Sequence, residues 1–245
     1  MYENYTGKDL IIATGAPGSR WSGILRMLTA NIDINVSDEN EDRLYDHMAI
    51  NPKTGKLAAR GWHRGAYWGP DHDFGSQFDV INQLSKDEIV EQFKGPYANW
   101  EPGIKIIKSH WFAYHLPFLK KMFPEAKFVG VYRTNEECFE WWHICGGWDI
   151  SYPHYYWYKN DERMKQKIAE ENEHIMNFFP NLEFRKIDEM FSLLGLPNKT
   201  ITFEDFTARD SKLTDVLANR RGNREEGNYE DALNFVVERH KIGII

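Results

Sequence analysis

The sequence has few cysteines, no long hydrophobic run and no N-terminal signal-peptide pattern. Its only two cysteines, Cys138 and Cys145, are seven residues apart, which separates them by two helical turns and is too far for a disulfide. We therefore expect two reduced thiols. Because no apolar stretch approaches the roughly 20 residues that span a membrane, the sequence predicts a cytoplasmic protein without a membrane partner.

The sequence also lacks an excess of basic residues, and this excludes nucleic acids as a general class of partner. The chain has 30 Lys and Arg residues against 37 Asp and Glu, a formal net charge of -7, whereas a general nucleic-acid binder needs a basic face. A hydrophobic content of 42% is enough for a sizeable core. With no internal repeat and no low-complexity linker, we expect one domain over residues 1–245, in an oligomeric state that the sequence leaves open.

Short apolar runs alternate with helical patterns along the chain. We expect buried strands at residues 9–14, 104–108, 127–132 and 200–203. Helices are expected at residues 24–32, 85–93, 116–122, 136–144, 161–178, 184–194, 211–219 and 229–240, the second of them opened by a capping box at Ser85. This alternation favours an α/β fold in which a central parallel sheet of about four to five strands is covered on both faces. Residues 33–84 lack periodicity and predict an irregular insertion.

The first expected strand runs into a glycine-rich turn, Gly15-Ala16-Pro17-Gly18-Ser19-Arg20-Trp21-Ser22, that precedes a helix. Such a turn presents backbone N–H groups and the positive end of a helix dipole to an anion. It is not a Walker A loop, because Arg20 and Trp21 stand where that motif has Gly and Lys. The turn alone indicates an anion site, and a purely structural turn stays open as the alternative.

Two further strands end in residues that suit anion chemistry. The second ends in Lys108-Ser109-His110 and the third in Arg133. Ligands of open α/β sheets bind beyond the carboxyl ends of the strands. Strand alternation predicts that Lys108 and His110 point to the same side. The imidazole of His110 could then act as a base while the lysine balances charge on a leaving group. A structural role for either residue stays open.

Four segments, in this order along the chain, resemble the cytosolic sulfotransferase family. The glycine-rich turn is similar to the loop that holds the donor's 5′-phosphosulfate in that family. Lys108-Ser109-His110 resembles its strand-end Lys-Thr-His, and Arg133-Thr134-Asn135 its strand-end Arg-Asn-Pro. Arg220-Arg221-Gly222 is similar to the Arg-Lys-Gly triplet that grips the donor's 3′-phosphate.

The resemblance implies a three-layer α/β/α fold related to P-loop nucleotide kinases. It implies transfer of a sulfuryl group from 3′-phosphoadenosine 5′-phosphosulfate (PAPS) to a hydroxyl or amine, with His110 as general base, Lys108 assisting, adenosine 3′,5′-bisphosphate (PAP) as product and no metal. The acceptor would be a small molecule or a glycan, with residues 33–84 on its side of the site. The implied donor-binding residues are Gly15, Pro17, Gly18, Ser19, Arg20, Trp21, Ser22, Arg133, Arg220, Arg221 and Gly222.

Two positions depart from the family pattern. Gly18 stands where the family's loop carries Lys or Arg, and the nearest cation is Arg20. Trp141 stands where the family has a serine that contacts the 3′-phosphate. Two other functions stay open on the same fold. One is a P-loop nucleotide phosphotransferase, which needs a magnesium ligand and a loop lysine, and the other is a non-catalytic nucleotide-binding protein.

Overall fold

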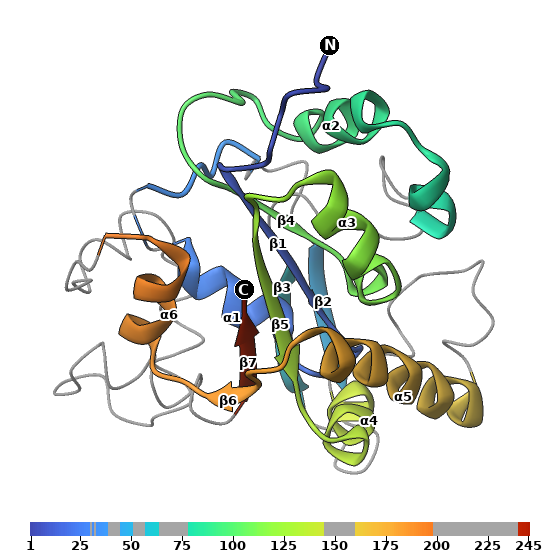
Figure 1. Cartoon of the computed structure of the whole chain (residues 1–245). Helices are drawn as coiled ribbons and strands as arrows, with labels where there is room; N and C mark the ends of the chain where they lie inside the picture. The colour runs from blue at the N-terminus through green and yellow to red at the C-terminus, as the bar shows by residue number, and fades with distance from the viewer. Residues whose placement is uncertain are drawn as a thin grey trace, which may run out of the picture.

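The computed structural model describes residues 1–29, 31, 33–38, 45–50, 57–63, 78–144, 160–197 and 240–245. These residues form a five-stranded sheet, a separate two-stranded hairpin and a set of helices (Figure 1). In the order of neighbours, the strands of the large sheet are β4 (Lys105–Lys108), β1 (Leu10–Gly15), β5 (Lys127–Tyr132), β7 (Lys241–Ile244) and β6 (Glu183–Phe184).

The large sheet is mixed. β4, β1 and β5 run parallel, with Ile11 of β1 opposite Ile106 of β4 and Ile12 opposite Phe128 of β5. β7 runs antiparallel to β5, and β6 antiparallel to β7. The protein is therefore an α/β protein with a mostly parallel sheet core, and the expectation of a wholly parallel sheet is wrong at the side formed by β7 and β6.

Helices cover both faces of this sheet. One face carries α1 (Trp21–Leu28) and α6 (Ile187–Leu194) over a core that includes Ile11 and Val129. The other carries α2 (Lys86–Lys94), α3 (Leu116–Met122) and the C-terminal half of α5 (Asp161–Phe178) over a core that includes Ile12 and Phe128. Helix α4 (Asn135–Ile144) and two 3-10 helices, η2 (Phe78–Gln83) and η3 (His110–His115), complete the described helices.

Apolar runs located most of these elements correctly. The strands expected at 9–14, 104–108 and 127–132 are present within one residue at each end, and the helices expected at 116–122 and 161–178 coincide with α3 and α5. Helix α6 begins at Ile187 rather than near Phe184, because Glu183 and Phe184 pair with β7 instead. The strand expected at 200–203 and the helices expected at 211–219 and 229–240 lie outside the described residues, except for His240 at the end of the last expected helix.

Strand β7 depends on a close contact with the end of α5. Gly130 of β5 and Gly243 of β7 lie opposite each other in the sheet. A Cβ atom on either glycine would come closer than 3.0 Å to the side chain of Phe179, the C-cap residue of α5. Two bare backbone positions on neighbouring strands thus accommodate one buried aromatic ring, and only glycine permits that approach.

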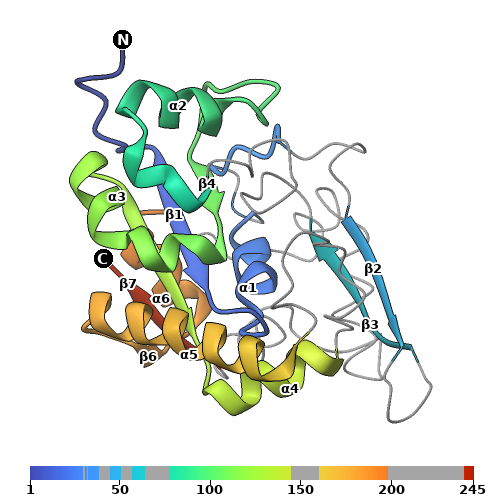
Figure 2. The ribbon, with the colours of Figure 1, turned by 90° about the vertical axis from the view of Figure 1, so that its right-hand side faces the viewer.

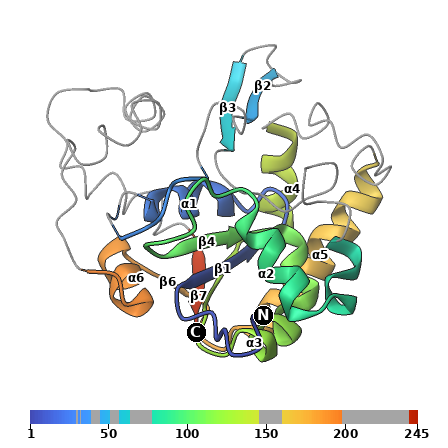
Figure 3. The ribbon, with the colours of Figure 1, turned by 90° about the horizontal axis from the view of Figure 1, so that it is seen from above.

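The segment 33–84 is not wholly irregular, contrary to expectation. Strands β2 (Tyr45–Ile50) and β3 (Leu57–His63) form an antiparallel hairpin outside the main sheet (Figure 3). Their pairing runs from Tyr45 opposite His63 to Ile50 opposite Leu57, with a register shift between Ala49 and Ile50. Neither strand shows a clean alternation of apolar and polar residues, and for this reason the sequence pattern did not indicate them.

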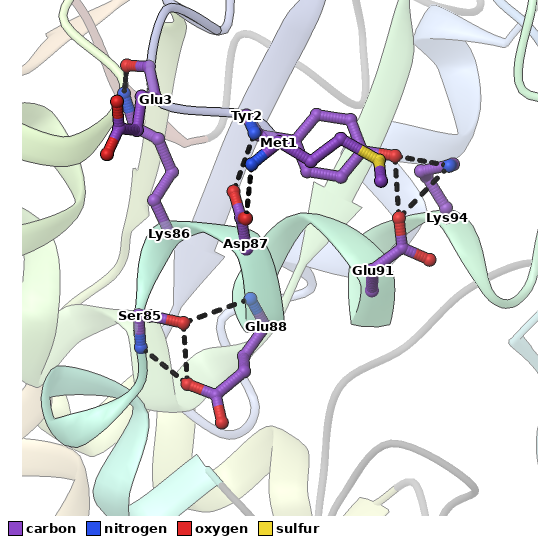
Figure 4. A network of polar contacts seen from close by, with 9 residues as sticks. All are labelled: Met1, Tyr2, Glu3, Ser85, Lys86, Asp87, Glu88, Glu91 and Lys94. Carbon is purple, nitrogen blue, oxygen red and sulfur yellow. Dashed lines mark hydrogen bonds and ion pairs between the residues drawn. The ribbon is translucent and has the colours of Figure 1, made fainter.

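The capping box expected at Ser85 is present, and the N-terminal segment is fastened to the helix that it opens (Figure 4). Ser85 N donates to Glu88 Oε2 at 2.8 Å, and Glu88 N donates to Ser85 Oγ at 3.3 Å. The N-terminal ammonium and Tyr2 N both bond the Asp87 carboxylate. These contacts hold the chain before β1 at the end of the sheet opposite α4 (Figure 1).

In the part of the chain that the structure describes, no helix combines the length and the apolar composition needed to cross a lipid bilayer.

Candidate functional site

Three sequence-predicted segments meet at one edge of the sheet, because β4, β1 and β5 are parallel neighbours whose carboxyl ends lie side by side. The segment after β4 is fastened to β1, since Ser109 N donates to Ala13 O at 3.1 Å and Thr14 Oγ1 donates to His110 O at 3.2 Å. The turn after β1 packs against α4, which follows β5. Figure 2 shows α1, α4 and α5 around this edge.

The glycine-rich turn has left-handed backbone at two positions, Gly18 with φ of 80° and Arg20 with φ of 63°. A Cβ atom on Gly18 would overlap the carbonyl oxygen of Cys138 in α4. Position 18 therefore has neither the conformation nor the space for a side chain. This gives a physical reason why the loop has no Lys or Arg there.

Hydrogen-bond donors without partners line the turn and the end of β5. The side chain of Ser19 is fully buried, and its Oγ has no hydrogen-bond partner among the described residues. Nε and Nη1 of Arg133 are likewise buried without a hydrogen-bond partner among the described residues, although Nη2 lies 3.5 Å from the Glu137 carboxylate. Buried donors are normally satisfied, so this excess indicates a place for an acceptor such as an oxyanion.

His110 and Glu171 form a buried pair between η3 and α5. His110 is 3% exposed and Glu171 is 0% exposed. His110 Nδ1 lies 2.9 Å from Glu171 Oε1, and Lys167 Nζ lies 3.8 Å from the same oxygen. Glu171 Oε2 has no hydrogen-bond partner in the described structure. A carboxylate that accepts from Nδ1–H fixes the tautomer in which Nε2 holds the lone pair, and this is the form that can accept a proton.

Helix α5 is hydrogen-bonded to the segments that follow β4 and β5, the two strands that neighbour β1. Next to Glu171, the buried Asn172 donates from Nδ2 to Arg133 O at 2.9 Å and to Asn135 Oδ1 at 2.8 Å. Adjacent residues of one helix thus hold the segment after β4 and the segment after β5. The sequence pattern predicted a helix over residues 161–178 and did not indicate these contacts. The missed signal was a polar pair within its buried stripe of Met164, Ile168 and Ile175.

Two carboxylates of α5, Glu170 and Glu171, lie near the phenol of Tyr114. Burial raises the pKa of Tyr114 well above its ordinary value, and the nearby charges of Glu171 and Glu170 raise it further. Tyr114 donates to Glu170 Oε2 at 3.2 Å, as a neutral phenol can. On the α4 side, burial raises the pKa of the Cys138 thiol to about 12, so this cysteine is not a nucleophile at neutral pH.

Lys108 does not share the surroundings of His110, contrary to the expectation from strand alternation. It lines a small cavity on the α1 face of the sheet together with Leu25, Thr29, Ile34, Asn35, Asp38, Tyr97 and Ile106. The alternation fails because β4 ends at Lys108. Ser109 then caps η3, accepting from Trp111 N at 3.1 Å, and this turn directs the ring of His110 towards α5.

The remaining predicted residues have mixed placements. Trp21 belongs to the apolar core under α1, and Pro17 is buried in the turn. Arg20 and Ser22 are half-buried at the end of the turn and the start of α1. The guanidinium of Arg20 lies over the ring of Trp141, with Cζ 3.4 Å from the ring centroid. Arg220, Arg221 and Gly222 lie outside the described residues.

No group of three or more His, Cys, Asp or Glu side chains that could hold a metal ion occurs among the residues described. Neither a family model, nor a curated protein, nor a solved structure matches the chain. The family resemblance therefore stays a prediction. The structural indication of function is the arrangement of His110, Glu171, Arg133 and the glycine-rich turn.

Proposed function

We propose that this protein is a sulfotransferase that moves a sulfuryl group from PAPS to a hydroxyl or amine of a small-molecule or glycan acceptor. The observation that supports this most is the His110–Glu171 pair, at the sheet edge where the glycine-rich turn and Arg133 also lie. The turn and Arg133 supply donors for an oxyanion, and the pair supplies a base. Sulfuryl transfer needs these two functions within one site.

The proposed reaction is an in-line displacement at sulfur. The acceptor oxygen or nitrogen forms a new bond to sulfur while the bond from sulfur to the bridging oxygen of the 5′-phosphate breaks. The leaving phosphate keeps the electron pair, and the proton of the acceptor passes to Nε2 of His110. Glu171 holds Nδ1–H throughout, which keeps the ring oriented and stabilises the imidazolium that forms.

The anionic groups of the donor are assigned to the glycine-rich turn and to Arg133. Ser19 Oγ and the backbone of the glycine-rich turn would bind the 5′-phosphosulfate, because they stand before the N-terminus of α1. The buried N–H groups of Arg133 would bind a phosphate in the forked geometry of a guanidinium. Since Lys108 lies on the α1 face and not beside His110, the proposal does not include charge balance on the leaving oxygen by Lys108.

Ligand-induced stabilisation tests the donor class. PAP at about 100 times its Kd is expected to raise the unfolding free energy by about 2.7 kcal/mol, or the Tm by roughly 5–10 °C, without magnesium. The measurement is a thermal-shift comparison of PAP with ATP, each with and without Mg²⁺. Stabilisation by ATP only in the presence of Mg²⁺, with none by PAP, would instead indicate a nucleotide phosphotransferase.

Replacing Glu171 by Gln tests the orienting role of the carboxylate. The amide NH₂ can donate to Nδ1 of His110, which fixes the tautomer whose Nε2 carries a hydrogen and cannot take a proton. We expect kcat to fall about 10- to 100-fold while the Kd of PAP stays within about twofold. Glu170→Gln is the matched control, because Glu170 bonds Tyr114 and not His110. An unchanged kcat in Glu171→Gln would remove this role.

A further inference from the structure

The two positions at which the sequence departs from the sulfotransferase pattern are in direct contact. Arg20 precedes α1 and Trp141 lies in the second half of α4. The guanidinium carbon of Arg20 is 3.4 Å from the centroid of the Trp141 ring. At this distance the planar cation lies against the face of the indole, which is the most favourable of the aromatic partners for such a contact.

The structure explains why the cation of this turn is at position 20. A side chain at position 18 would overlap Cys138 O, and Ser19 is fully buried. Arg20 is the first position after them and it is half-buried. Its backbone is left-handed, which is unfavourable for a residue other than glycine and persists only where the surroundings enforce it. The stack on Trp141 is one such constraint.

We infer that Trp141 is a positioning residue that holds the guanidinium of Arg20 at the glycine-rich turn for a phosphate or sulfate group of the ligand. A guanidinium stacked on the face of an indole keeps its N–H groups pointing outwards in its own plane, where they can donate to two oxygens of one oxyanion. A long, flexible arginine side chain is thereby restricted before the ligand arrives. The identification of that ligand as PAPS rests on the proposed function.

Trp141 thereby takes a role different from that of the serine in the family that the sequence resembles. A serine would contact the ligand itself, whereas Trp141 contacts the cation that would bind it. The oxyanion subsite would then consist of the turn backbone, Ser19 Oγ and the edge of Arg20, supported from α4. This subsite is distinct from Arg133, whose buried N–H groups follow β5.

The test is a set of substitutions at positions 20 and 141, with isothermal titration of PAP and of inorganic pyrophosphate as a simple oxyanion probe. Trp141→Ala is expected to weaken both probes about 3- to 30-fold, the range that a cation–π contact accounts for. Trp141→Phe retains an aromatic face and is expected to stay within about threefold of the wild type. Arg20→Lys keeps the charge but loses the planar fork, so we expect a loss similar to that of Trp141→Ala.

Trp100→Ala is the matched control. Trp100 also contacts a cation, Lys105 at 4.7 Å, but Lys105 begins β4 at the opposite end of the strand from His110. Affinity for both probes should be unchanged in this variant, and circular dichroism with a melting curve checks that every variant is folded at the titration temperature. Equal affinities in Trp141→Ala and the wild type, or an equal loss in Trp100→Ala, would overturn the inference.

The two probes separate this inference from the proposed function. Pyrophosphate binding that depends on Trp141, in a chain that does not bind PAP, would support the oxyanion role of the stacked pair and contradict a PAPS donor. Tight PAP binding that is insensitive to Trp141 would support the donor and overturn the positioning role. A wild-type chain that binds neither probe would overturn both.

Discussion

His110→Ala is expected to lower kcat by about 10²- to 10⁴-fold, the contribution typical of a positioned general base. The affinity for PAP should stay within about threefold of the wild type, because the residues assigned to the donor are Ser19, the turn and Arg133 rather than the imidazole. The measurement combines a sulfuryl-transfer assay over a panel of hydroxyl and amine acceptors with titration of PAP. Turnover within about twofold of the wild type would show that another group accepts the proton.

A loss of stability must be separated from a loss of chemistry in this variant. Removing the ring leaves the buried Glu171 carboxylate without its nearest partner, since Lys167 Nζ is 3.8 Å away, and such a change destabilises proteins by about 3–5 kcal/mol. The double variant His110→Ala/Glu171→Gln removes the unpaired charge of the buried carboxylate. It should therefore recover much of the decrease in Tm without recovering turnover. His174→Ala serves as a control, because this exposed histidine contacts the ring of Tyr114 only at the surface of α5.

Gly18→Ala is expected to destabilise the protein by roughly 2–5 kcal/mol. The added methyl group would overlap Cys138 O, and the left-handed backbone at position 18 is unfavourable for any residue with a Cβ atom. For a chain of this length, such a loss corresponds to a decrease in Tm of roughly 5–15 °C, measured by calorimetry or circular dichroism.

Gly23 provides the matched control for this substitution. It is exposed in α1, only five positions further on, and a Cβ atom there would have no neighbour within 4 Å. Gly23→Ala should therefore raise the unfolding free energy by about 0.5–1 kcal/mol, through the higher helix propensity of alanine. If both variants melted at the same temperature as the wild type, the close packing of the turn on α4 would be contradicted.

The sequence located elements better than it located contacts. The apolar runs of β1, β4 and β5 mark buried strands without reference to other parts of the chain, and the Ser85 capping box is a local signal as well. The expected convergence of 15–22, 108–110 and 133 at one sheet edge followed from parallel neighbours, and the structure brings these segments together. Local pattern and strand direction were sufficient for these features.

Other features depend on partners that are distant in the chain, and no local pattern specifies them. The bond between His110 and Glu171 joins residues 61 positions apart, and whether Glu171 faces solvent or the sheet is decided by the packing of α5. The exclusion of a side chain at Gly18 depends on the carbonyl of Cys138 in another helix. Lys108 and His110 separate because a 3-10 turn begins immediately after β4, whereas alternation applies only while a strand continues.

The contact of Phe179 with two facing glycines sets how far α5 stands from the sheet. Because neither Gly130 nor Gly243 has a side chain, the helix end rests on the strand backbones themselves. Glu171 precedes Phe179 by eight residues, about two turns, so the reach of its carboxylate towards the imidazole depends on this spacing. A methyl group on either strand would tilt the helix outwards and separate the acid from the base, although neither glycine touches them.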